Sequence, residues 1–116
     1  MSKMIALDFD GVLHSYTSGW QGPGEIPDPP TPGAQEFCRK LLGAGYEVVV
    51  FSSRSNYVEG LRSIHLWLTE NSFPSEIRVV TQKPSAHVAL DDRSITFMGH
   101  WPSIDEIVNF KPWNRQ

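Results

Sequence analysis

The sequence predicts an α/β domain built on a mainly parallel β-sheet with helices on both faces. Short apolar runs alternate along the chain with longer segments whose apolar residues recur at helical spacing. The short runs are continuously apolar, which is typical of parallel strands buried on both faces. The chain has 116 residues, and neither an internal repeat nor a linker divides it. We therefore expect one domain.

Five segments are predicted to be strands, the last of them from the weakest pattern: Met4–Phe9, Tyr46–Ser52, Ile77–Thr81, Ala86–Leu90 and Ile95–Met98. Helices are predicted between and after them. The first carries the apolar stripe Ala34, Phe37, Cys38, Leu41 and Leu42, and the second the stripe Tyr57, Leu61, Ile64 and Leu68. Asn56 with Glu59 is predicted to cap the second helix, and Ser103 with Glu106 a third. Strands and helices in this order are typical of an α/β fold.

Composition excludes several classes of protein. Ten basic and 13 acidic residues give a formal charge of −3, which argues against a strongly basic nucleic-acid binder. No apolar run approaches the ~20 residues of a membrane span, and the N-terminus lacks the pattern of a secretory signal. A single cysteine excludes an internal disulfide framework. We expect a cytoplasmic protein with no membrane partner.

Polar groups follow four successive predicted strands. Asp8 and Asp10 end the first and Ser52 the second, Lys83 lies just past the third, and Asp91 with Asp92 ends the fourth. The carboxyl ends of parallel strands meet at one edge of a sheet, where such folds carry their sites. Two tight acidic pairs at this edge would repel each other unless a divalent cation lay between them. The sequence therefore predicts a metal site for Mg²⁺ with Asp8, Asp10, Asp91 and Asp92.

These residue types fit phosphoryl transfer. An aspartate such as Asp8 can attack phosphorus and form an aspartyl-phosphate. Asp10 can serve as general acid for the leaving oxygen and then as base for water, and strand alternation would put it on the same side as Asp8. Ser52, or Ser53 in its place, can donate a hydrogen bond to the phosphoryl oxygens, and Lys83 can stabilise their charge.

Residues 14–32 break the pattern. These nineteen residues have no periodicity and contain five prolines, and a loop of this length is usually functional or disordered. We expect a flap over the site that controls the choice of substrate. His14, Tyr16 and Trp20 are candidates for substrate contact, with Trp20 as an anchor of the loop on the core as the alternative. For Arg54, substrate contact and a surface ion pair are both open.

The same residues resemble the motifs of the haloacid dehalogenase superfamily of phosphohydrolases. They are DFDGVL at 8–13, VVVFSSR at 48–54, QKP at 82–84 and ALDDR at 89–93. The resemblance implies a single Rossmann-like core over residues 1–116, with Asp8 as nucleophile, Asp10 as acid–base residue, and Ser52 and Lys83 as phosphate binders. It implies Mg²⁺ held by Asp8, the backbone carbonyl of Asp10, and Asp91, with Asp92 direct or through water.

Two arginines indicate a more specific resemblance within the superfamily. Arg54 and Arg93 are similar to arginines of the 3′-phosphatase domain of polynucleotide kinase-phosphatases, and the chain also resembles small hydrolase-like proteins of phage and bacteria. The spacing between motifs leaves no room for the cap domain that the superfamily often inserts. An open site suits a phosphorylated substrate such as a nucleic-acid end or a nucleotide.

Two alternatives remain. One is a small-metabolite phosphatase whose site is closed by a neighbouring subunit of a homo-oligomer. The other is a non-catalytic phospho-binding module, since receiver domains also arrange acids, Ser/Thr and Lys around Mg²⁺. The order of motifs favours the hydrolase, because the Asp-Asp pair here follows the fourth strand, after Lys83.

Overall fold

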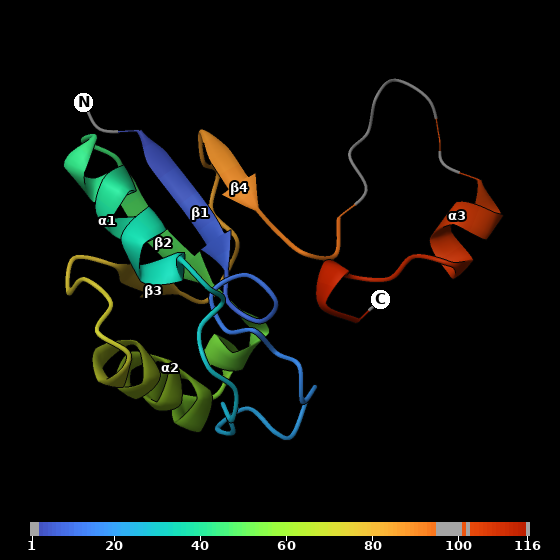
Figure 1. Cartoon of the computed structure of the whole chain (residues 1–116), viewed down its shortest axis with the longest axis horizontal. Helices are drawn as coiled ribbons and strands as arrows, with labels where there is room; N and C mark the ends of the chain where they lie inside the picture. Colours follow the sequence, from blue (N-terminus) through green and yellow to red (C-terminus); the bar gives the residue numbers. More distant parts are fainter. Residues whose placement is uncertain (1–2, 95–100, 102, 116) are drawn as a thin grey trace.

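A computed structural model describes residues 3–94, 101 and 103–115 of the chain (Figure 1). Its strands are β1 (Met4–Asp8), β2 (Glu47–Phe51), β3 (Arg78–Val80) and β4 (Val88–Leu90). They form one parallel sheet in the order β3-β2-β1-β4. The helices are α1 (Ala34–Gly43), α2 (Val58–Glu70) and α3 (Ile104–Val108), with 3-10 turns η1 (Ser53–Asn56) and η2 (Trp113–Arg115). The predicted α/β class with a parallel sheet is confirmed. The expected fifth strand, Ile95–Met98, lies outside the described residues.

One apolar cluster forms the core on one face of the sheet. Ile5 and Leu7 of β1 pair in register with Val48 and Val50 of β2, and all four belong to it. Buried residues of both long helices join the same cluster: Ala34 and Cys38 of α1, and Ile64, Trp67 and Leu68 of α2. The helices therefore share this face. Right-handed crossovers explain why, since β1, β2 and β3 follow one another in a single direction across the sheet.

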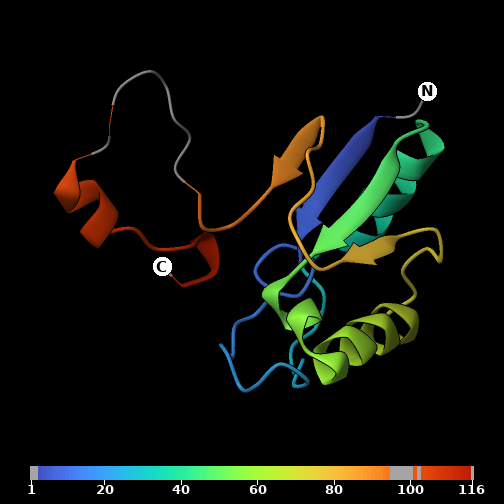
Figure 2. The same ribbon diagram turned by 180° about the vertical axis from the view of Figure 1, so that it is seen from behind.

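The opposite face is covered differently from our expectation. Ala6 and Val49 pair in register there and are fully buried. Figure 2 shows the connection 81–87 passing from β3 to β4 on the side away from α1. This connection is too short to hold a crossover helix. Among the described residues, α1 and α2 thus lie on one face of the sheet, and the connection 81–87 crosses the other.

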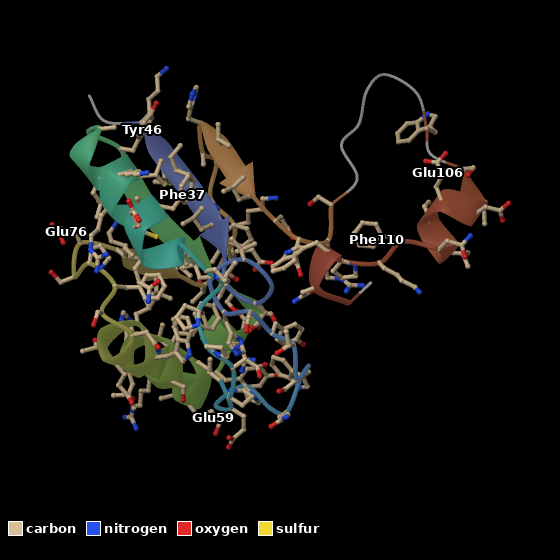
Figure 3. All side chains as sticks on the ribbon, in the orientation of Figure 1. Phe37, Tyr46, Glu59, Glu76, Glu106 and Phe110 are labelled. Carbon is tan, nitrogen blue, oxygen red and sulfur yellow. The ribbon has the colours of Figure 1, made fainter. Side chains whose placement is uncertain are left out.

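The helix signals in the sequence were partly correct. In α1, Leu41 and Leu42 pack against the core, but Phe37 of the predicted stripe is 42% exposed (Figure 3). Asn56 does not cap α2, because it lies in η1 and Tyr57 occupies the N-cap position. The predicted cap of α3 is confirmed, since the Ser103 side chain accepts a hydrogen bond of 3.1 Å from the Glu106 N–H.

The C-terminal segment leaves the sheet and then returns to it. Helix α3 lies apart from the sheet, and Phe110 follows it on the way back toward η2 (Figures 1 and 3). There the Trp113 indole donates a hydrogen bond of 2.8 Å to the Gly11 carbonyl, and the Asn114 amide donates one to the Ser15 carbonyl. The chain end therefore contacts the loop that follows β1. None of the helices in the described ranges has the length and apolar character needed to cross a membrane.

Candidate active site

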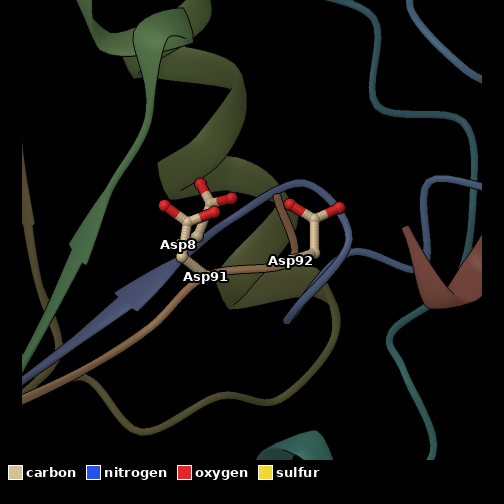
Figure 4. A group of neighbouring side chains, drawn as sticks. All are labelled: Asp8, Asp91 and Asp92. Carbon is tan, nitrogen blue, oxygen red and sulfur yellow. The ribbon is translucent and has the colours of Figure 1, made fainter. Parts of the chain in front are cut away.

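Three carboxylates meet at the carboxyl edge of the sheet. Asp8 ends β1, and Asp91 and Asp92 follow β4, which is its parallel neighbour. One oxygen from each carboxylate lies within 4.8 Å of the others, and the three side chains project to the same side (Figure 4). The predicted gathering of Asp8, Asp91 and Asp92 at one edge is what the structure shows.

Burial and neighbouring negative charge disfavour the charged forms of Asp8 and Asp92. Burial, followed by the charges of Asp91 and Asp92, raises the pKa of Asp8 to about 8, although the Phe9 N–H donates to Asp8 at 2.9 Å and opposes the shift. Burial and the charge of Asp91 also raise the pKa of Asp92. Three acids held this way are stabilised when a cation lies among them, because opposite charge favours ionisation.

Gly11 permits this packing. Its φ of +84° lies in the left-handed region, and a Cβ atom there would sit 1.9 Å from Oδ2 of Asp92. Any other residue would be strained and would also displace this carboxylate. The glycine after the two aspartates is therefore needed for the acidic cluster itself.

Lys83 and Ser52 border the acidic cluster. The Lys83 ammonium is 3.8 Å from Oδ2 of Asp91 and 5.5 Å from the centre of the Phe51 ring. The buried Ser52 hydroxyl oxygen accepts a hydrogen bond of 3.1 Å from the Arg54 N–H, which leaves its own proton free to donate. Ser53 is exposed on η1. Phosphate binding by these residues stays a prediction.

Asp10 has a separate environment. Strand β1 ends at Asp8, so the alternation expected to put both side chains on one side does not extend to Asp10. Its Oδ2 accepts a hydrogen bond of 2.8 Å from Nε of Arg54, and its Oδ1 lies 2.8 Å from Nδ1 of His14. A cation and an imidazole therefore hold Asp10, while Asp8 is surrounded by acids.

Arg54 is fully buried, which excludes the surface ion pair that was one of the two roles left open for it, and its ion pair with Asp10 is an internal one. Its Nη1 donates to three carbonyls of the loop 14–32, those of Gly22, Pro23 and Glu25, at 2.8–2.9 Å. Its guanidinium lies 4.7 Å from the centre of the Trp20 ring, which is half exposed. This contact supports the interpretation of Trp20 as an anchor of the loop, and it encloses Arg54 away from any substrate in this conformation.

His14 is also fully buried. Its ring packs against Phe9, Tyr16 and Trp67, and its Nε2 accepts a hydrogen bond of 3.1 Å from the Asp28 N–H. The imidazole has no face open to a substrate here, contrary to the contact expected from the sequence. Sequence reasoning missed Asp28 altogether, and nothing in the spacing of the prolines around it could have indicated its role.

A pocket of about 280 Å³ lies elsewhere, between residues 24–26 and α2. Its lining includes Ser63, Leu66 and Glu70, but no member of the acidic cluster. The carboxylates therefore lie outside this pocket, at the carboxyl edge of the sheet.

These observations define an α/β protein with an acidic cluster at the carboxyl edge of a parallel sheet. No protein-family model matches the sequence, and no curated protein matches it either. Among solved structures, D,D-heptose 1,7-bisphosphate phosphatase from Burkholderia thailandensis is similar over 70% of this chain, with 27% identity and a TM-score of 0.48. The chain spans about half of that protein, 52% of its length. A likeness of this degree assigns neither a family nor an activity.

Proposed function

We propose that this chain is a Mg²⁺-dependent phosphomonoester hydrolase that works through an aspartyl-phosphate. The observation that carries the proposal is the meeting of Asp8, Asp91 and Asp92 at the carboxyl edge, beside Lys83. The motif resemblance to haloacid dehalogenase phosphohydrolases supports it, because the same residues occupy the positions of that superfamily's nucleophile, metal ligands and phosphate-binding lysine.

The donor set fits magnesium. Carboxylates are hard oxygen ligands, and Asp8, Asp91 and Asp92 offer one oxygen each within a small volume. The backbone carbonyl of Asp10 would complete the protein ligands implied by the motif. When bound, Mg²⁺ would keep Asp8 ionised at neutral pH and neutralise charge on the phosphoryl oxygens.

In this mechanism, each side chain has a separate role in the two half-reactions. An ionised Asp8 oxygen bonds to phosphorus while the ester oxygen leaves with the bonding electrons and takes a proton from Asp10. In the second half, Asp10 removes a proton from water, the water oxygen bonds to phosphorus, and Asp8 leaves as a carboxylate. Ser52 and Lys83 stabilise the charge that spreads over the transferring oxygens.

The substrate class follows from an open site. We propose an exposed phosphate on a nucleic-acid end, a nucleotide or another open substrate, with the loop 14–32 acting as a flap. Tyr16 and the half-exposed Trp20 are the aromatic residues that it offers to a flat leaving group. Because Trp20 lies over Arg54 and Tyr16 packs against His14, a replacement of either residue has to be compared on the natural substrate and on a small aryl phosphate, and only a loss confined to the natural substrate supports substrate selection.

The decisive experiment measures hydrolysis of an aryl phosphate with Mg²⁺ and with excess EDTA. Activity that requires Mg²⁺ and disappears in Asp8→Asn, but persists in the matched control Asp105→Asn on the exposed helix α3, is the expected result. Full activity with EDTA would overturn the metal-dependent mechanism. Phosphate binding without turnover would favour the phospho-binding module instead.

A panel of phosphorylated compounds then tests the substrate class. It contains 3′- and 5′-phosphorylated oligonucleotides, nucleotides and sugar phosphates. Highest kcat/KM on sugar phosphates, together with a homo-oligomer in solution, would favour the small-metabolite alternative. Highest kcat/KM on oligonucleotides or nucleotides is the expected outcome.

A further inference from the structure

We infer that His14 is a positioning residue for Asp10, and that it couples the orientation of this carboxylate to the conformation of the loop 14–32 through Asp28. The inference rests on the proposed function, in which Asp10 transfers the protons. It assigns to His14 a role that does not involve contact with substrate.

Burial limits what His14 can do. Its side chain is fully buried, and its ring centre lies 5.6 Å from that of Phe9, 5.9 Å from Tyr16 and 5.7 Å from Trp67. A ring packed on these sides cannot turn without opening the core around it. His14 is therefore a fixed element of the fold rather than a group that reaches out to a ligand.

Hydrogen-bond partners determine which ring nitrogen carries the proton. The Asp28 backbone N–H can only donate, so Nε2 of His14, 3.1 Å away, is the acceptor. In the neutral ring the proton is then on Nδ1, which donates to Oδ1 of Asp10 at 2.8 Å. The peptide of Asp28 thereby sets the tautomer that Asp10 requires.

Two donors fix the plane of the Asp10 carboxylate. His14 donates to Oδ1 and Arg54 donates to Oδ2, each at 2.8 Å, so rotation about the last side-chain bond would break both contacts. Each oxygen keeps one further lone pair, whose direction is now defined. A general acid depends on this direction, because proton transfer requires hydrogen-bond geometry to the leaving oxygen.

Asp28 is itself held in place by its surroundings. Its carboxylate accepts from the Ser18 N–H at 2.8 Å and from the Ser18 hydroxyl at 2.5 Å, and its carbonyl accepts from the Trp67 indole at 3.2 Å. Next to it, the Ser15 N–H donates to the Pro29 carbonyl at 3.0 Å, which joins the two ends of the loop. The path from loop to acid thus consists of Ser18, Asp28, His14 and Asp10.

Two substitutions separate the two contacts of His14. In His14→Asn the side-chain amide lies near the position of Nδ1 and can still donate to Asp10, but it cannot reach Asp28. In His14→Gln the longer amide reaches the position of Nε2 and the Asp28 N–H, but the donor to Asp10 is lost. His65→Gln, on the exposed side of α2, is the matched control.

The readout is kcat/KM with Mg²⁺ for aryl phosphates of increasing leaving-group pKa. A general acid contributes about 10²–10⁴-fold, so partial misplacement in His14→Gln should cost about 10–100-fold for the poorest leaving group and little for the best. The dependence on leaving-group pKa becomes steeper in His14→Gln, while His14→Asn, which keeps the donor to Asp10 but loses the contact with Asp28, gives a slope between those of His14→Gln and the wild type. A purely structural role would lower all rates equally and leave the slope unchanged.

The outcomes separate this inference from the proposed function. An inactive wild-type protein contradicts the phosphatase proposal. An active wild type with an unchanged slope in His14→Gln overturns the positioning role alone. A third measurement needs neither activity nor a variant: ¹⁵N NMR of the imidazole should show a protonated Nδ1 and an unprotonated Nε2, and the opposite tautomer would overturn the inference.

Discussion

Asp8 and Asp10 are two residues apart in the sequence but have opposite surroundings. Asp8 lies among acids, with Asp91 and Asp92 in reach and its pKa raised to about 8 by burial and their charges. Asp10 lies among donors, with Arg54 on one oxygen and His14 on the other. Beside the acidic cluster, the Lys83 ammonium lies 3.8 Å from Asp91, whereas the Asp10 carboxylate receives a donor on each of its two oxygens.

In the proposed mechanism, the two aspartates meet two different requirements of phosphoryl transfer. A nucleophile has to be ionised at the moment of attack, and an adjustable external charge can provide that. A proton donor and acceptor has to keep its geometry through both half-reactions, which a rigid network of buried donors can provide. We infer that the acidic cluster depends on ionic conditions, and that the environment of Asp10 depends on the fold.

The largest expected effect is the loss of turnover when Asp8 or Asp10 is replaced by asparagine. Asp8→Asn should reduce turnover by about 10⁴-fold or more, since it removes the nucleophile. Asp10→Asn should cost about 10²–10⁴-fold, since it removes proton transfer. Steady-state kinetics with Mg²⁺ measures both, and acid-quenched mass spectrometry should find phosphate on Asp8. Wild-type turnover in Asp8→Asn would end the covalent mechanism.

Removal of the buried arginine should affect stability next most strongly. Arg54→Met leaves the Asp10 carboxylate without its ion-pair partner and three loop carbonyls without a donor, so we expect a loss of about 3–5 kcal/mol in the free energy of unfolding. Urea denaturation measures it, with the exposed Arg62→Met as control. If Arg54→Met does not fold, Arg54→Lys keeps the charge and should show an intermediate loss. An effect no larger than that of Arg62→Met would contradict the network.

Gly11→Ala tests the packing of the acidic cluster. The new methyl group would meet the Asp92 carboxylate, and the left-handed φ adds strain of about 1–3 kcal/mol. We expect both a lower unfolding free energy and weaker Mg²⁺ binding by calorimetry. Gly43→Ala, at the end of α1, is the control. A Cβ atom added at Gly43 would meet nothing within 4 Å, so this variant should be neutral or slightly stabilising. Equal effects in the two variants would argue against the close approach of Gly11 and Asp92.

The pH dependence of stability should reveal the raised pKa of Asp8. Because the pKa of Asp8 in the folded protein is raised from 3.8 to about 8, its contribution to stability without metal is full below pH 4 and is lost as the pH rises through 8. Magnesium binds the ionised form, so the rise in Tm on adding Mg²⁺ should grow from pH 5.5 to pH 8.5. Thermal unfolding with and without Mg²⁺ measures this rise. A Mg²⁺ effect that is the same at all pH values would contradict the shifted titration.

The smallest expected effect concerns the C-terminal contact. Trp113→Phe keeps an aromatic ring but removes the hydrogen bond from the indole to the Gly11 carbonyl, which should cost about 0.5–1.5 kcal/mol. Thermal unfolding gives the stability, and kcat/KM shows whether the loop after β1 has moved. An unchanged Tm together with unchanged kinetics would mean that the returning segment does not support the site.

Much of the acidic cluster could be predicted from the sequence. The apolar runs Met4–Phe9, Tyr46–Ser52 and Ala86–Leu90 predicted parallel strands, and parallel strands bring their carboxyl ends to one edge. That geometry puts Asp8, Asp91 and Asp92 at the same edge, and the pairing of β1 with β4 then brings them together. The order of these residues along the chain therefore determined the α/β class and the place where the acids meet.

Tertiary structure decided the environment of Asp10. Arg54 is 44 positions away in the sequence and Asp28 contacts His14 across 14, and neither spacing follows a helical or strand period. An irregular proline-rich loop brings these groups together, and no local pattern predicts its path. The same holds for the side of the sheet on which α1 and α2 lie, because that depends on strand order. Short-range periodicity thus determined the strands and the acids at their ends, while the contact of Arg54 with Asp10 and the contact of Asp28 that orients His14 depend on long-range packing that only the folded chain defines.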